Sequence, residues 1–96
     1  MKTVLNLTFK PDNEKEPPST TAKLLVVCLK SMPERGFDFT EIRARQRIFD
    51  VIENVQDGGE IQLEDADHAK VVECVRASRW VEPSKHLITF AEQFGL

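Results

Sequence analysis

The sequence predicts an α+β domain in which three or four helices pack on a small two-stranded antiparallel sheet. Two short segments alternate between apolar and polar residues, as half-buried strands do. Several longer segments repeat apolar residues at helical spacing, and a chain of 96 residues is too short for two cores. We therefore expect residues 1–96 to form a single domain.

The first expected strand covers residues 3–9, with the sequence TVLNLTF. Leu5, Leu7 and Phe9 occupy alternate positions, which predicts that they face the core. Asn6 and Thr8 lie between them and are expected to face solvent. The strand is expected to end at the segment that follows.

Residues 10–20 contain three prolines, five charges and no apolar side chain, so an exposed loop is expected there. The segment after it, residues 20–32, is harder to assign, because its six consecutive apolar residues fit either a buried strand or a buried helix. The spacing of Leu25, Leu29 and Met32 favours the helix. Its candidate N-cap residues are Ser19, Thr20 and Thr21.

The stretch GFDFTEIRARQRIFDVIENVQDGG predicts the clearest helix of the chain. Asp38 and Glu41 have the spacing of a capping box, and Phe37 and Ile42 that of a hydrophobic staple. The glycine pair 58–59 is expected to stop this helix. Its apolar stripe consists of Ile42, Ile48, Phe49, Ile52 and Val55.

A second strand is predicted at EIQLE, residues 60–64, with Ile61 and Leu63 facing inward. Its expected partner is the N-terminal strand, which is the other good strand candidate. The following helix is expected to begin with Asp65 as N-cap and Asp67 in its first turn, where carboxylates complement the helix dipole. The buried stripe of that helix is expected to contain Val71, Val72 and Val75.

The chain ends with a predicted helix that has Pro83 in its first turn. Its apolar face is expected to hold Leu87, Phe90, Ala91 and Phe94.

No motif in the sequence predicts catalysis, a cofactor or a metal ion. The acids of residues 64–67 lack the spaced ligands and the glycine of a calcium loop, and helix capping explains them. Cys28 and Cys74 lie in apolar surroundings, which is typical of buried reduced thiols. His68 lies six residues from Cys74, roughly 240° away around a helix, so the two cannot share a ligand site locally. We therefore expect a non-enzymatic protein without cofactors.

Basic side chains form one candidate partner-binding set. Arg43 and Arg47 share one helix face, and together with Arg76 and Arg79 they suggest a patch to which Lys85 adds. The net charge of −3 argues against non-specific binding of nucleic acid, and the strand between the helices does not fit a helix-turn-helix. A solvated helix surface is the favoured interpretation of these side chains.

Trp80, the only tryptophan, is the remaining candidate partner-binding residue. Tryptophan is common both as a core anchor and at interface hot spots. The sequence favours the core position and leaves the interface position open.

The order GFDFTEIRARQRIFDVIE, then GGEIQLEDADHAKVVECVRASRW, then a final apolar helix resembles small uncharacterised proteins of tailed phages and prophages. The likeness covers most of the chain apart from residues 10–20 and carries no catalytic or ligand motif. It implies an accessory phage protein of the bacterial host cytoplasm, without a particular activity.

Two classes of function remain after these exclusions. The favoured one is a module that binds a phage or host protein, in virion assembly or in modulation of a host protein. The alternative is a small nucleic-acid-binding or transcription-associated regulator that uses the arginine patch. No apolar run is long enough to span a membrane, so no membrane partner is expected. An unpaired edge of the small sheet also leaves self-association open.

Overall fold

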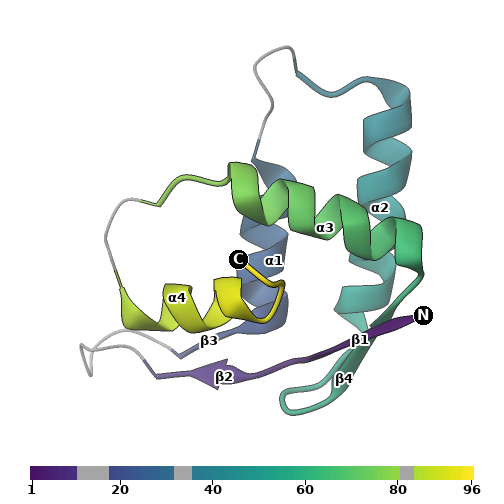
Figure 1. Cartoon of the computed structure of the whole chain (residues 1–96). Coiled ribbons are helices and arrows are strands. Elements are labelled where there is room, and N and C mark those ends of the chain that lie inside the picture. The colour runs from purple at the N-terminus through teal and green to yellow at the C-terminus, as the bar shows by residue number, and fades with distance from the viewer. Residues whose placement is uncertain (11–17, 32–35, 81–83) are drawn as a thin grey trace.

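Two strands that are distant in sequence form the small sheet of this protein. The computed structural model describes residues 1–10, 18–31, 36–80 and 84–96. Strand β1 (Lys2–Leu5) runs antiparallel to β4 (Glu60–Leu63), as predicted. A second, shorter antiparallel pair joins β2 (Thr8–Phe9) to β3 (Ser19–Thr20) (Figure 1).

The predicted orientation of the first strand is wrong for its N-terminal half. Val4 is 5% exposed and Leu5 is 50% exposed, so the inward face is the opposite of the expected one. Asn6 is also buried, whereas Phe9 faces the core as expected. The alternation changes because backbone and side-chain hydrogen bonds of Asn6 interrupt the strand between β1 and β2.

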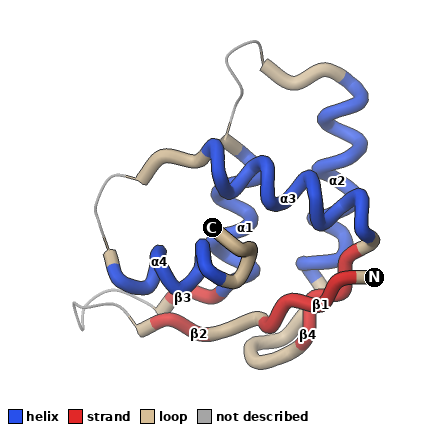
Figure 2. Tube along the Cα trace, viewed as in Figure 1, coloured by secondary structure: helices blue, strands red, loops and turns tan. Residues whose placement is uncertain are grey.

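The described residues form four helices, which lie to one side of the strands (Figure 2). They are α1 (Thr21–Lys30), α2 (Phe39–Glu53), α3 (Asp65–Ala77) and α4 (Lys85–Glu92). The α+β class is thus confirmed, with four helices and a two-stranded antiparallel sheet beside the extra β2–β3 pair.

The segment that fitted helix or strand is the helix α1. Its N-cap is Thr20, whose hydroxyl accepts a hydrogen bond from the Lys23 N–H at 3.2 Å. Thr20 is buried and Ser19 belongs to β3, so the C-terminal end of the predicted loop 10–20 is ordered structure. Residues 11–17 of that loop lie outside the described residues, as do Met32 and Pro83.

The expected cap of α2 is confirmed at Asp38, whose carboxylate accepts from the Glu41 N–H at 2.8 Å. The other half of the capping box is wrong, because the Glu41 carboxylate binds Arg45 and Lys70 instead of turning back to the cap. The glycine pair does not stop α2 either. The helix ends at Glu53, and Gly58, with a φ of +81°, serves the turn that leads into β4.

The start of α3 also differs from the predicted cap. Glu64 holds the N-cap position, and its side chain makes no capping hydrogen bond. The Asp65 carboxylate lies 3.4 Å from the amino group of Met1, and Asp67 binds Arg47. The acids at this helix start therefore form ion pairs as well as complementing the helix dipole.

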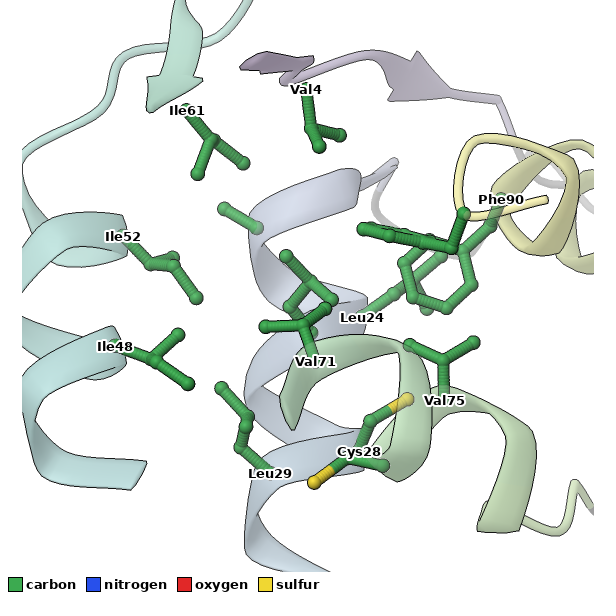
Figure 3. Packing of buried hydrophobic residues seen from close by; sticks show 14 of the residues in the cluster. Val4, Leu24, Cys28, Leu29, Ile48, Ile52, Ile61, Val71, Val75 and Phe90 are labelled. Atoms are coloured by element: carbon green, nitrogen blue, oxygen red, sulfur yellow. The ribbon is translucent and has the colours of Figure 1, made fainter. Parts of the chain in front are cut away.

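Helix α1 lies at the centre of the core. Val4 and Ile61 reach toward it from the sheet, Ile48 and Ile52 from α2, and Val71 from α3 (Figure 3). The aromatic ring of Phe90, 1% exposed, brings α4 into the same cluster. All four helices and the sheet thus share one apolar core, which fixes α4 against the body of the domain.

A partly buried cluster of polar side chains links the N-terminal strand, the start of α1 and the C-terminal end of the chain. The side-chain oxygen of Asn6 accepts from the Ala22 N–H at 2.8 Å, and its amide donates to the carbonyl of Gln56. Thr21 Oγ1 lies 2.9 Å from Gln93 Oε1, and Gln93 donates to the carbonyl of Leu5 at 2.8 Å. The position of the C-terminal helix relative to β1 therefore depends on specific hydrogen bonds as well as on apolar packing.

Candidate functional site

The arginines that suggested a patch do not gather into one. Arg47 donates from two of its nitrogens to Asp67, with Nη2 only 2.6 Å from Oδ1. This hydrogen bond and the charge of Asp67 raise the pKa of Arg47. Arg47 therefore fastens α2 to the first turn of α3, while Arg43 is exposed on α2.

The other two arginines lie at the opposite end of α3. Arg76 is in the last turn of the helix, nine residues from Asp67, which places it roughly 14 Å further along the axis. Arg79 donates to the carbonyls of Ala77 and Ser78 at 3.3 Å each, beside the C-terminus of α3. Arg47 pairs with Asp67 at the start of α3, whereas Arg76 and Arg79 lie at the end of that helix. The predicted arginine patch is therefore divided between two sites.

Arg45 is the basic residue whose role the sequence interpretation missed. It is 8% exposed and donates to the carbonyls of Leu29 and Ser31, at 2.7 and 3.2 Å, where α1 ends. Its guanidinium also lies 4.7 Å from the centre of the Phe37 ring. The spacing of the sequence indicates this burial, because Arg45 precedes the core residue Ile48 by three positions and so lies on the same face of α2.

Lys70 and Glu41 form a second partly buried ion pair, between α3 and α2. Burial alone would lower the pKa of Lys70, but the hydrogen bond to Glu41 and the charge of Glu73 outweigh it and raise the pKa. The hydrogen bond from Lys70, with that from Arg45, lowers the pKa of Glu41. The lowered pKa of Glu41 and the raised pKa of Lys70 keep both side chains charged at neutral pH, so neither is tuned to act as a general acid or base there.

The two cysteines are buried thiols. Cys28 is 1% exposed and Cys74 is 5% exposed, and burial raises the pKa of both. A nucleophilic cysteine needs a lowered pKa and access to substrate, and neither thiol has them. Within the four described stretches of the chain, no three histidine, cysteine or acidic side chains group as metal ligands would.

An apolar groove lies between the end of α3 and the helix α4, with a volume of about 590 Å³. We call it the Trp80 groove. Its lining consists of Ser78, Arg79, Trp80, Ser84, Lys85, Leu87, Ile88 and Ala91. Ile88 is 62% exposed although it is a large aliphatic residue on a regular helix, so α4 leaves an apolar surface uncovered there.

Trp80 joins this groove to the core. Its ring meets that of Phe90 edge-on, with the ring centres 6.3 Å apart and the planes at 83°. Phe90 is almost fully buried, whereas Trp80 remains 36% exposed. Trp80 is therefore not part of the buried core, and its ring packs edge-on against a core residue while it offers surface to the groove.

The rim of the Trp80 groove is basic. Arg79 and Lys85 both line it and both are exposed. Lys85 is the first residue of α4, where a cation opposes the helix dipole, and the first turn of this helix has no acid. Among the described residues that line the groove, the charged ones are thus basic, whereas the whole chain has a net charge of −3.

A smaller apolar surface lies at the start of α2. Phe39 is 76% exposed and Ile42 is 47% exposed, next to a cavity of about 160 Å³ that Phe37 and Phe49 help to line. The staple pair Phe37 and Ile42 thus faces this cavity with partly exposed side chains. We refer to this area as the α2 surface.

No protein-family model, no curated protein and no solved structure matches this chain. Among the helices that the structure describes, none has the length and apolar character to cross a membrane.

Proposed function

We propose that this protein is a small non-enzymatic accessory protein that binds another protein through the Trp80 groove. The observation that carries the proposal is the half-exposed Trp80, held by Phe90 next to the exposed Ile88. Tryptophan in a partly preformed apolar pocket is typical of the few residues that dominate binding energy at protein interfaces. The edge-on contact with Phe90 packs part of the ring before a partner binds, and such preorganisation lowers the entropic cost of binding.

The phage or prophage setting, with virion assembly or modulation of a host protein as the process served, is part of the proposal and depends on the sequence resemblance alone. The arginine-based alternative is less well supported. Binding to nucleic acid needs several cations that face one phosphate track, whereas Arg47 is engaged by Asp67.

The test is a pull-down from nuclease-treated lysate of cells that carry the gene, washed at high salt. The tagged wild-type chain is compared with Ile88→Asp, which puts a charge into the groove, and with Ile42→Asp, which does so on the α2 surface. Both isoleucines are exposed helix residues, so both variants are expected to fold. We expect one stoichiometric partner with the wild type and Ile42→Asp, and at least about tenfold less with Ile88→Asp.

Two results would contradict the proposal. The first is a partner retained equally by all three chains. The second is retention of nucleic acid, and of no protein, when the nuclease is omitted and the salt is low.

A further inference from the structure

We infer that the segment that occupies the Trp80 groove is an acidic amphipathic stretch of the partner, with apolar side chains flanked by aspartate or glutamate. The inference rests on the proposed protein-binding function and adds the chemistry of the partner. It follows from an apolar floor and a basic rim that belong to the same groove.

The floor selects apolar side chains. Leu87, Ile88 and Ala91 lie on α4 at helical spacing, and Trp80 faces them from the chain that leaves α3. A groove of about 590 Å³ is within the range of roughly 300–1,000 Å³ that takes a ligand or a few side chains. An occupant without apolar groups would leave this surface in contact with water and gain little from binding.

The rim selects negative charge. Arg79 follows the end of α3 and Lys85 begins α4, so both segments that border the groove bring a positive charge to its lining. The N-terminus of α4 adds the positive end of a helix dipole beside Lys85. A lysine at that position weakens the helix slightly, and a carboxylate of the partner would remove this conflict.

A second copy of the chain fits the groove less well. An isologous dimer would bring the same patch of each copy together, and Arg79 and Lys85 would face their own equivalents. The net charge of −3 on each copy adds a general repulsion. A different protein with local acidic residues avoids both costs.

Trp80 supplies the experiment, because it is the only tryptophan and reports on this groove alone. The full chain is titrated with short amphipathic peptides that lack tryptophan and tyrosine, while the emission of Trp80 is recorded. One peptide carries leucines with glutamates, a second has every glutamate replaced by lysine, and a third keeps the glutamates but has serine for leucine.

We expect the acidic apolar peptide to shift the emission to shorter wavelength and to bind roughly three- to tenfold tighter than the basic one, since two exposed ion pairs contribute modestly. The serine peptide is expected not to bind. In Lys85→Glu the preference between the two apolar peptides should weaken, and in the double variant Arg79→Glu, Lys85→Glu it should reverse. Lys85→Glu places an acid at a helix start, so it is expected to fold at least as well as the wild type.

Equal binding of the acidic and basic peptides, or an unchanged preference in the double variant, would overturn the acidic-partner inference. The proposed function would survive that result if the pull-down still depended on Ile88. Binding of neither peptide, together with quenching of Trp80 by single-stranded oligonucleotide, would overturn the inference. Since the pull-down does not depend on the peptides, it decides separately whether the proposed function fails.

Discussion

The guanidinium of Arg47 and the carboxylate of Asp67 form an ion pair between α2 and α3, in which the arginine is exposed and the aspartate is buried. The Arg47 side chain is 62% exposed, whereas that of Asp67 is 5% exposed. If Asp67 is lost, Arg47 can turn to water, but loss of Arg47 leaves a buried carboxylate without its partner. Breaking a pair by removing the exposed member is therefore the more damaging change.

This asymmetry predicts that Arg47→Met lowers the midpoint of thermal unfolding more than Asp67→Asn does. Circular dichroism on both single variants and on the double variant measures the effect. The double variant should be more stable than Arg47→Met alone. Equal losses in the two single variants, or additive losses in the double variant, would show that the pair is no more than a surface contact.

The buried amide of Asn6 predicts a larger stability effect. Asn6 is 1% exposed, and its side chain satisfies the N–H of Ala22 and the carbonyl of Gln56. Asn6→Ala leaves the buried N–H of Ala22 without an acceptor, whereas the carbonyl of Gln56 keeps its hydrogen bond from the Gly59 N–H. The substitution should therefore lower the free energy of unfolding by about 1–3 kcal/mol. Urea denaturation measures this, with Gln62→Ala on the exposed face of β4 as control. If Asn6→Ala lowered the free energy of unfolding no more than the control does, water would be replacing the hydrogen bonds of the amide, and the prediction would be wrong.

The buried thiols predict that labelling depends on unfolding. Burial of Cys28 and Cys74 and their raised pKa values should make both unreactive toward a thiol reagent in the folded protein. The labelling rate should rise by orders of magnitude across the urea transition and follow the unfolded fraction. Rapid labelling of either cysteine in native buffer would disprove the prediction.

The pair formed by Glu41 and Lys70 predicts a dependence of stability on acid. The pKa of Glu41 is lowered in the folded chain, below about 4.3 for a free glutamate. Its contribution to stability is therefore complete above that value and is lost as the pH falls through the folded pKa. Glu41→Gln should flatten the fall of the urea midpoint between roughly pH 5 and pH 3. Glu53→Gln, exposed on the same helix, should leave the fall unchanged. Identical pH profiles for Glu41→Gln and the wild type would contradict the prediction.

Local patterns in the sequence were sufficient to predict most of the fold. The spacing of Asp38 from Glu41 predicted the cap of α2, and the alternation around Ile61 predicted β4. These features depend on neighbouring residues, so the local sequence specifies them.

The errors concern side chains whose partners are distant in sequence. Asn6 is buried because Ala22 and Gln56 supply its hydrogen bonds, and polar residues in an alternating strand are expected to face solvent. Arg45 is buried because the end of α1 offers it carbonyls. A single sequence does not show which distant groups meet, so the local pattern predicted the opposite exposure for Asn6 and made no prediction for Arg45.

The candidate site was predictable only in part. Trp80 and Arg79 were identified from the sequence, but Lys85 appeared only as an addition to a patch that the structure divides. Ile88 was missed, because it lies outside the apolar face that the helical spacing predicted for this helix and no other pattern singled it out. The groove results from the packing of α4 through Phe90, which leaves Ile88 on the outer face.

The central claim is that the partner docks at Trp80, and fluorine NMR tests it most directly. Biosynthetic labelling with fluorotryptophan gives this chain a single resonance, and an unlabelled partner adds none. Addition of the partner recovered by pull-down should shift or broaden this resonance. The change should reach saturation at the stoichiometry of the complex that size-exclusion chromatography gives. A complex that forms by chromatography while the Trp80 resonance stays unchanged would contradict the account and direct attention to the α2 surface.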